Sequence, residues 1–334
     1  MEDVVKRSNS GDIHVGISGW RYAPWRGSFY PKGLLQKYEL HFASRTVNSI
    51  EINGSFYRLQ TPESYKTWYE NTPDNFIFSI KAYREITHFK RLRNVEKPVA
   101  DFLASGVLDL KEKLGPILWQ FPPTFKFDPE LFKKFLDLLP KDTSSAKAFA
   151  RKSDRYVKSE RYVKSDSKEK HEDKKLRHAI EIRNESFVKD EFIDLLKDAG
   201  VALVIADTAG RWPQLEEITS DFVYMRLHGD TELYRSGYSE AALNYWFKRM
   251  KLWRDGKQLK DAKRISPKDP KDENRDVYCY FDNTDKLWAP YDARKILEKF
   301  KLDNNLEEVP GKMSKKYQKR PKDTGDTLDG DLFN

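Results

Sequence analysis

Eight short apolar or alternating segments, each followed by a helical pattern, limit the folds open to this chain of 334 residues. Residues 14–18, 47–53, 76–81, 117–121, 179–183, 202–207, 222–228 and 277–282 have the composition and spacing of strands. Eight strand–helix units within roughly 255 residues favour a single (β/α)8 TIM barrel of the α/β class.

Capping residues mark several of the helices. Thr61 and Asp128 are predicted N-caps, and each is followed by a proline at the first helical position. Gly200 has the position of a glycine that ends the fifth helix. An open doubly wound sheet is the competing fold, but the first strand continues as GISGW and lacks the GxGxxG phosphate loop. The barrel is therefore the expected fold.

The charge of the chain is concentrated in one segment. The formal net charge is +8, and residues 141–177 contribute +6 of it, with 13 basic and 7 acidic residues. Such a segment buries little apolar surface, so we predict a solvated insertion between the fourth helix and the fifth strand. A nucleic-acid-binding arm is the functional alternative. The insertion is expected on the face opposite the site, and its deletion should leave the fold intact.

The remaining organisation follows from composition. Residues 12–303 are expected to form the barrel domain, with disordered ends at 1–11 and 304–334. The terminal TLDGDLF is loosely similar to a bacterial sliding-clamp-binding peptide, but it lacks the expected glutamine, so no clamp contact is predicted. No apolar run approaches the length of a membrane helix, and the first residues do not form a secretory signal. Cys279 is the only cysteine, which fits a cytoplasmic protein.

In a TIM barrel the chemistry lies at the carboxyl ends of the strands. The period of two places Glu51 with Asn53, Glu181 with Arg183, and Arg226 with His228 on common strand faces. Carboxylates and cations are therefore predicted to meet at the barrel mouth. The candidate catalytic residues are Glu51, Glu181, Asp207 and His228. Further candidates for substrate binding at strand ends and in the loops beyond are Asn53, Lys81, His88, Gln120, Arg183, Arg226, Asp282 and Asn283.

The loops after the strands are rich in aromatic and arginine residues. This composition suits a cleft for an anionic or sugar-like ligand. The candidate aromatic contacts are Trp20, Tyr22, Trp25, Tyr57, Tyr234 and Tyr238. A network of ion pairs that only closes the top of the barrel would produce the same pattern of charged residues.

Seven segments in order resemble the YecE-like family, the domain of unknown function DUF72. They are GISGWRYAPWRGSFYP, SIEINGSFYRL, LGPILWQFPPTF, IEIRNESF, IADTAGRWP, YMRLHGDTELYRSGYS and YCYFDNTDKLWAPYDA, and they span about residues 12–303. The resemblance implies a TIM barrel and no particular activity. The fifth-strand motif of the family is similar to E-x-R-H-P-S-W, and here Asn184, Glu185 and Phe187 replace its His, Pro and Trp.

Three functions fit these residues. In the favoured one, Arg183, Arg226 and Lys81 hold an anionic substrate, Glu51 or Glu181 is the general base and His228 is the acid. In the second, Glu51, Glu181, Asp207, Asp282 and His228 bind a divalent metal for hydrolysis or isomerisation, as the distant fold analogy to apurinic endonucleases and xylose isomerases suggests. HxH and HExxH spacings are absent, which weakens the metal hypothesis.

The third is a nucleic-acid-binding module without catalysis. Its basic residues lie among aromatic ones in the loops after the strands. They are Arg21, Arg26, Arg58, Arg84, Lys90, Arg91, Arg93 and Arg235. Outside residues 141–177 the net charge is only +2, which weakens this hypothesis.

Overall fold

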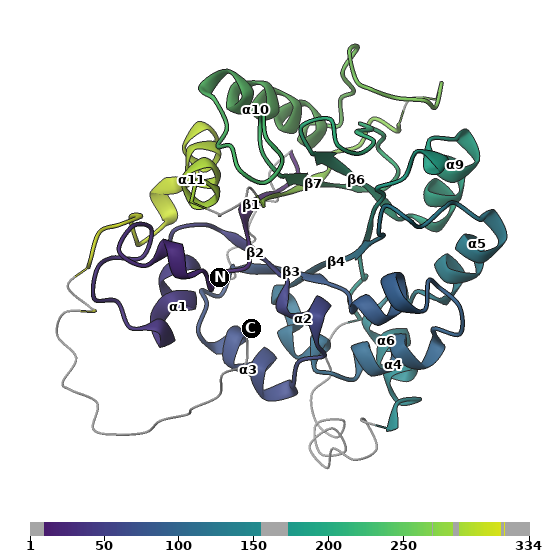
Figure 1. The fold of residues 1–334 in the computed structure, drawn as a ribbon, viewed down its shortest axis with the longest axis horizontal. Helices are drawn as coiled ribbons and strands as arrows, with labels where there is room; N and C mark the ends of the chain where they lie inside the picture. The colour runs from purple at the N-terminus through teal and green to yellow at the C-terminus, as the bar shows by residue number, and fades with distance from the viewer. Residues whose placement is uncertain (1–9, 155–172, 269, 283–286, 315–316, 318–334) are drawn as a thin grey trace, which may run out of the picture.

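The fold is a closed ring of parallel strands surrounded by helices (Figure 1). The computed structural model describes residues 10–154, 173–268, 270–282, 287–314 and 317. The strands are β1 (Ile13–Ser18), β2 (Ser49–Ile52), β3 (Ile77–Lys81), β4 (Leu114–Gln120), β5 (His178–Glu181), β6 (Ala202–Asp207), β7 (Phe222–Leu227) and β8 (Asp276–Phe281). They pair in chain order, and β8 closes on β1. The predicted TIM barrel is confirmed.

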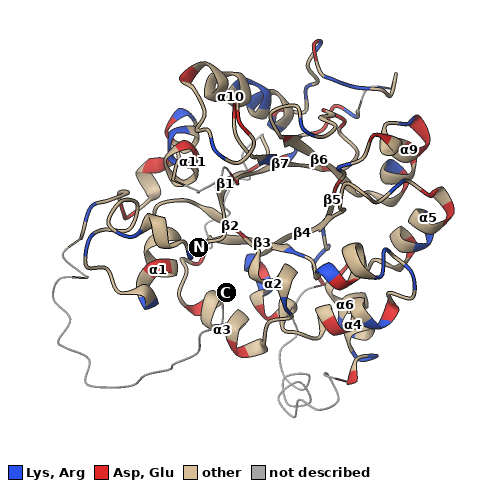
Figure 2. Ribbon diagram, viewed as in Figure 1, with Lys and Arg blue, Asp and Glu red and all other residues tan. Residues whose placement is uncertain are grey.

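Helices cover the outside of the ring, and their charged residues lie along these outer elements (Figure 2). They are α1 (Glu39–Ala43), α2 (Gly54–Tyr57), α3 (Pro62–Glu70), α4 (Glu96–Leu103), α5 (Pro129–Leu138), α6 (Thr143–Ala150), α9 (Asp190–Ala199), α10 (Glu240–Arg254) and α11 (Ala289–Lys299). The Thr61 and Asp128 side chains accept the predicted capping hydrogen bonds, and Gly200 ends α9 at φ 67°. No helix within the described ranges is long and apolar enough to cross a membrane.

The sixth unit differs from the prediction because residues 208–221 contain no helix. This connection has only 14 residues and includes Pro213. It runs beside the loop that follows α10. The buried Glu217 carboxylate accepts hydrogen bonds from the backbone N–H groups of Ile265 and Ser266 at 2.6 and 2.7 Å. These bonds and the buried Leu215 and Ile218 cover the strands where a helix was expected.

Alternation along the strands separates two cores. One lies between the strands and the helices. The other fills the barrel interior with small and aromatic residues: Leu118, Ala179, Ala202, Val204, Ala206, Phe222, Tyr224, Tyr278 and Tyr280. Tyr280 hydrogen-bonds the hydroxyls of Ser49 and Ser79 at 2.7 Å each, so the polar groups of this layer have partners. The floor beneath the barrel mouth is therefore packed.

The predicted solvated insertion is too long at both ends. Residues 143–150 form α6, which packs against α4 and buries Ala146 and Ala150. Asp142 caps this helix by accepting the backbone N–H of Ser145 at 2.7 Å. Near the other end, Leu176 is buried and donates its backbone N–H to the carbonyl of Lys141. The rest of the segment, 155–172, lies outside the described residues.

Part of the predicted disordered tail is also packed. Glu308 is buried, and its backbone N–H donates to the carbonyl of Arg45. The Tyr317 hydroxyl lies 2.8 Å from Nδ1 of His41 on α1, and its ring contacts Phe42. The remaining tail residues, 315–316 and 318–334, and residues 1–9 at the other end lie outside the described part of the chain.

Two substitutions in α6 test whether this segment belongs to the folded barrel. Ala150→Glu places a carboxylate where the side chain is 2% exposed, and we expect it to lower the free energy of unfolding by more than about 2 kcal/mol. Ala148→Glu, on the exposed face of the same helix, should change it by less than about 0.5 kcal/mol. Urea unfolding measures both. Equal stability of the two variants would mean that α6 does not pack as described.

Candidate functional site

The strands are parallel, so all eight carboxyl ends meet at one end of the barrel. In β7, the side chains of Tyr224 and Arg226 point into the barrel, and His228 follows on the same face. Glu51 of β2 and Glu181 of β5 meet them there. The predicted meeting of carboxylates and cations at the mouth is thus present in the structure.

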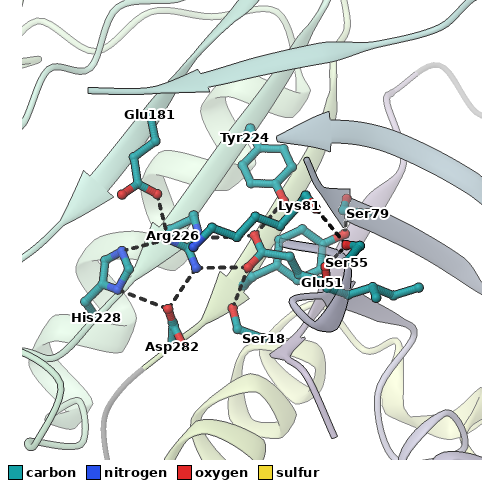
Figure 3. Close-up of polar contacts among 12 residues, drawn as sticks. Ser18, Glu51, Ser55, Ser79, Lys81, Glu181, Tyr224, Arg226, His228 and Asp282 are labelled. Carbon is teal, nitrogen blue, oxygen red and sulfur yellow. Dashed lines mark hydrogen bonds and ion pairs between the residues drawn. The ribbon is translucent and has the colours of Figure 1, made fainter. Parts of the chain in front are cut away.

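Arg226 is the centre of this group, with its side chain 1% exposed. Its guanidinium donates to Glu51 Oε2 from Nε at 3.0 Å and to Glu51 Oε1 from Nη2 at 2.9 Å. Nη1 donates to Glu181 Oε2 at 2.6 Å, and Nη2 to Asp282 Oδ2 at 2.8 Å. Figure 3 shows the guanidinium between the three carboxylates. Arg226 was predicted to hold a substrate anion, and in this structure its donors are occupied by protein carboxylates.

Glu51 is also saturated. Besides both bonds from Arg226, it accepts hydrogen bonds from the hydroxyls of Ser18 at 3.0 Å and Tyr224 at 2.7 Å. The side chain is completely buried. These four hydrogen bonds from protein groups hold the carboxylate in a fixed position against Arg226. The geometry thus makes Glu51 a positioning residue for Arg226, in place of the predicted general base.

The Glu181 carboxyl is held ionised by the two neighbouring guanidinium groups. Burial alone would raise the pKa of its carboxyl, but the charges of Arg183 and Arg226 outweigh burial and hold the pKa well below its usual range. Burial alone would lower the pKa of the Arg226 guanidinium. The neighbouring carboxylates of Glu51, Glu181 and Asp282 outweigh burial and raise this pKa well above the ordinary value. The fixed ionisation of these groups removes Glu181 as a ready base.

Arg183 lies at the edge of the group, 11% exposed. Its Nε donates to Glu181 Oε1 at 2.7 Å, and its guanidinium lies 4.0 Å from the ring centre of Trp212. These contacts fix the plane of the guanidinium. Within the described residues, its two terminal nitrogens make no hydrogen bond. Arg183 is therefore placed to bind an oxyanion in bidentate fashion.

His228 is buried under Tyr234, whose ring is 5.1 Å away in an edge contact. Burial and the charge of Arg226 lower the pKa of the imidazole, so the ring is neutral at pH 7. Nε2 faces an N–H of Arg226 at 3.5 Å, which assigns the ring proton to Nδ1. Nδ1 lies 3.4 Å from Asp282 Oδ2 but makes no hydrogen bond to a described residue.

Lys81 ends β3 with its side chain 8% exposed. Its amine lies 4.2 Å from the ring centre of Phe56, and no hydrogen bond or ion pair joins it to any described residue. Burial and the nearby charge of Arg226 lower the pKa of the amine to about 7. Lys81 therefore changes its protonation state near neutral pH, whereas an ordinary lysine stays protonated there.

A second polar atom at the mouth, besides the Lys81 amine, lacks a partner among the described residues. The side-chain oxygen Oδ1 of Asn53 is buried and accepts no hydrogen bond from a described residue. Asn53 follows β2, Lys81 ends β3 and His228 follows β7. An unpaired buried polar group costs free energy, so the Lys81 amine and Asn53 Oδ1 at one barrel end suggest a place for a ligand.

Several predicted residues lie away from this group. Asp207 faces outward from β6, where its Oδ2 accepts hydrogen bonds from Tyr238 at 3.1 Å and Trp246 at 3.3 Å. Trp25 is fully buried against Phe29, and Trp20 packs against Trp68. These aromatic and acidic residues serve packing, because alternation or the loop geometry turns them away from the barrel interior. They therefore lie outside the group around Arg226.

The other predicted residues surround the mouth. Tyr22 donates its hydroxyl to the carbonyl of Ser18 at 2.6 Å. His88 packs on Phe56, and burial together with Lys81 lowers its pKa to about 4. Gln120 is buried at the end of β4, and Tyr57 is 61% exposed on the loop after β2. Asn283 lies outside the described residues.

The predicted metal ligands are not arranged as a metal site. The carboxylates of Glu51, Glu181 and Asp282 surround a guanidinium, and Asp207 is on the other side of its strand. Across the described ranges, no three His, Cys, Asp or Glu side chains are placed to hold an ion.

Sequence reasoning missed Tyr224, Ser18 and Trp212 as members of the site. Tyr224 precedes Arg226 by two residues, so the period of two that paired Arg226 with His228 would have found it. Ser18 was noted only as a strand end. No sequence pattern pointed to Trp212, because its contact with Arg183 depends on the path of the connection between β6 and β7, which contains no helix.

Strained backbone gathers in the loops at the same end of the barrel. Ala209 and Tyr234 have φ of 49° and 65°, and Arg91, Leu92 and Asn94 lie between 49° and 65°. Non-glycine residues in this region cost free energy and are often found at functional sites. In contrast, the cavity of about 390 Å³ at the other end of the barrel is lined in part by Asn48, whose amide is bonded to the β1 backbone.

Removal of the central guanidinium tests this account of the mouth. Arg226→Met leaves the buried Glu51 and Glu181 and the partly exposed Asp282 without their cation, and we expect a loss of about 3–5 kcal/mol in the free energy of unfolding. The exposed Arg211→Met is the matched control and should change stability by less than about 0.5 kcal/mol. A loss below about 1 kcal/mol for Arg226→Met in urea unfolding would contradict the arrangement described.

Known proteins resemble this chain in sequence and in fold. It is 32% identical over 130 residues to the UPF0759 protein YecE of Escherichia coli (strain K12). These aligned residues make up 38% of this chain and 44% of that protein. It is 30% identical over 118 residues to the UPF0759 protein YunF of Bacillus subtilis (strain 168), or 34% and 41% of the two chains. The chain thus spans less than half the length of these curated relatives.

Solved structures with the same fold include a DUF72 family protein of Thermotoga maritima, with a TM-score of 0.64 and 22% identity over 87% of this chain and 99% of that one. Another, from Enterococcus faecalis, has a TM-score of 0.59 and 17% identity over 87% and 98% of the two chains. Residues 14–316 match the family described as "Protein of unknown function DUF72". The chain belongs to the DUF72 family.

Proposed function

We propose that the barrel mouth is the active site of an enzyme that acts on a small anionic substrate by acid–base chemistry. The observation that supports it most is the unpaired, buried amine of Lys81 beside a guanidinium, Arg183, whose terminal nitrogens have no described partner. Arg183 can bind an oxyanion, and Lys81 can take up a proton at neutral pH.

The surrounding residues suit these roles. Arg226 and its carboxylates form a fixed floor, so Arg183 and Lys81 are held on a rigid support. A bound anion would favour the protonated form of Lys81 and so draw a proton from the substrate to the amine. The neutral His228 is a hydrogen-bond donor through Nδ1 in this scheme, and Lys81 takes the place of the glutamates as the base.

Hydrogen exchange tests the proposal without knowledge of the product. The protein is incubated in D2O with a panel of hydroxy acids and sugar phosphates, and loss of substrate C–H signals is followed by proton NMR. Catalysed exchange of at least one compound is expected, with a rate that rises through about pH 7 as Lys81 loses its proton.

Variants separate the two roles in this experiment. Lys81→Met should reduce exchange at least about 100-fold, because a general base typically contributes that much. Arg183→Met should raise the substrate concentration required, and the exposed Lys90→Met is the matched control with unchanged exchange. No exchange with any compound, or equal exchange by the wild type and Lys81→Met, would contradict the proposal.

A second candidate function, the binding of single-stranded nucleic acid, is favoured by the charge of three adjacent loops. Residues 19–38, 53–61 and 82–95, which follow β1, β2 and β3, contain nine Lys and Arg and a single Glu. Tyr57 and Phe89 in these loops are 61% and 60% exposed, and the Arg84 guanidinium lies within 5.6 Å of both ring centres. Basic groups with exposed rings suit phosphates and stacked bases.

Fluorescence anisotropy with a labelled oligothymidylate tests this candidate. Affinity should fall steeply as salt is raised, and Tyr57→Ala and Phe89→Ala should each weaken binding about tenfold. Tyr245→Ala removes an exposed ring on α10 and should leave the affinity unchanged. Binding that is insensitive to salt, or equal losses in all three variants, would speak against a nucleic-acid surface on these loops.

A further inference from the structure

We propose that the Lys81 amine is a nucleophile that forms an imine with the carbonyl group of an anionic aldehyde, ketone or oxo acid. The inference rests on the proposed function, because it places the substrate in the same barrel mouth, and it goes further by naming the substrate class and a covalent step. Its basis is the position of one amine among fixed charges and an aromatic ring.

The surroundings of Lys81 differ from those of the other deeply buried lysine in the described part of the chain. Lys113, which is 2% exposed, donates hydrogen bonds to the carbonyls of Tyr69 and Thr72 at 2.7 and 2.9 Å. Its amine therefore serves the fold. The Lys81 amine has no such partners and faces the ring of Phe56. An amine with a free lone pair in a buried position is suited to attack an electrophilic carbon.

The charges around Lys81 also suit the product. Burial and Arg226 disfavour the charged amine, while Glu181 and Glu51 counter part of this effect. The carbonyl carbon accepts the amine lone pair, and a proton moves from nitrogen to oxygen to give a carbinolamine. After a second proton arrives from solvent, the hydroxyl leaves as water. The balance is one amine, one carbonyl and one proton in, one iminium and one water out.

The protonated imine carries one positive charge, which the ionised Glu181 and the oxyanion of the bound substrate itself both counter. Arg183 supplies the site for the anionic end of the same molecule, since its terminal nitrogens have no described partner. A substrate with a carbonyl and an oxyanion in one small molecule meets both requirements.

Reductive trapping tests the inference. The wild-type protein is incubated at pH 7 with glyoxylate or with propionaldehyde, each in the presence of sodium cyanoborohydride, which reduces an imine to a stable amine. Peptide mapping by mass spectrometry then measures the modification of each lysine. We expect glyoxylate to modify Lys81 at least about tenfold faster than the exposed Lys90, because about half of the Lys81 amines are unprotonated at pH 7.

The remaining arms separate this inference from the proposed function. Propionaldehyde lacks the oxyanion, so its preference for Lys81 should be weaker, and Arg183→Met should reduce the glyoxylate preference to that level. Lys81→Met should lose the adduct while its circular dichroism spectrum is unchanged. Modification of Lys81 no faster than of Lys90 would overturn the inference. If glycolate, which has no carbonyl, still raises the melting temperature of the wild type but not of Arg183→Met, the anion site stands and only the imine is wrong.

Discussion

The hydrogen bonds between one guanidinium and three carboxylates determine how the side chains at the barrel mouth are arranged. Arg226 is 1% exposed and donates to Glu51, Glu181 and Asp282, which come from three different strands or strand ends. A buried charge of this kind is stable only with all its partners present. The network therefore ties β2, β5, β7 and the end of β8 together, and its charges lower the pKa of Glu181 and raise that of Arg226. Lys81 and the terminal nitrogens of Arg183 lie outside the network, and our proposals assign the ligand to them.

Much of the fold was predictable because strands and barrels follow local rules. All eight strands, the caps at Thr61 and Asp128 and the end of α9 at Gly200 were placed from alternation, capping residues and a glycine. The missing sixth helix and the packed α6 were not predicted, because both depend on contacts between segments far apart in the chain. Composition alone indicated neither the buried faces of Ala146 and Ala150 nor the packing of Tyr317 on α1.

The sequence predicted which residues meet at the site better than it predicted what each of them does. The period of two identified Glu51, Glu181, Arg226 and His228 as a group, but it could not show which donors would be saturated. Arg226 was expected to bind substrate, and the structure occupies it with protein carboxylates. Lys81 was one cation among several in the sequence. Its position beside Phe56, without a partner in the described residues, is a property of the folded barrel alone.

The account depends most on the state of the Lys81 amine, and NMR measures it directly. In protein labelled with carbon-13 lysine, the chemical shift of the carbon next to the Lys81 amine, assigned by comparison with Lys81→Met, is followed from pH 5 to pH 11. The account predicts a titration midpoint near pH 7, about three units below that of an ordinary lysine. A midpoint near 10 would show a charged amine at neutral pH and would contradict both the proposed base and the proposed nucleophile.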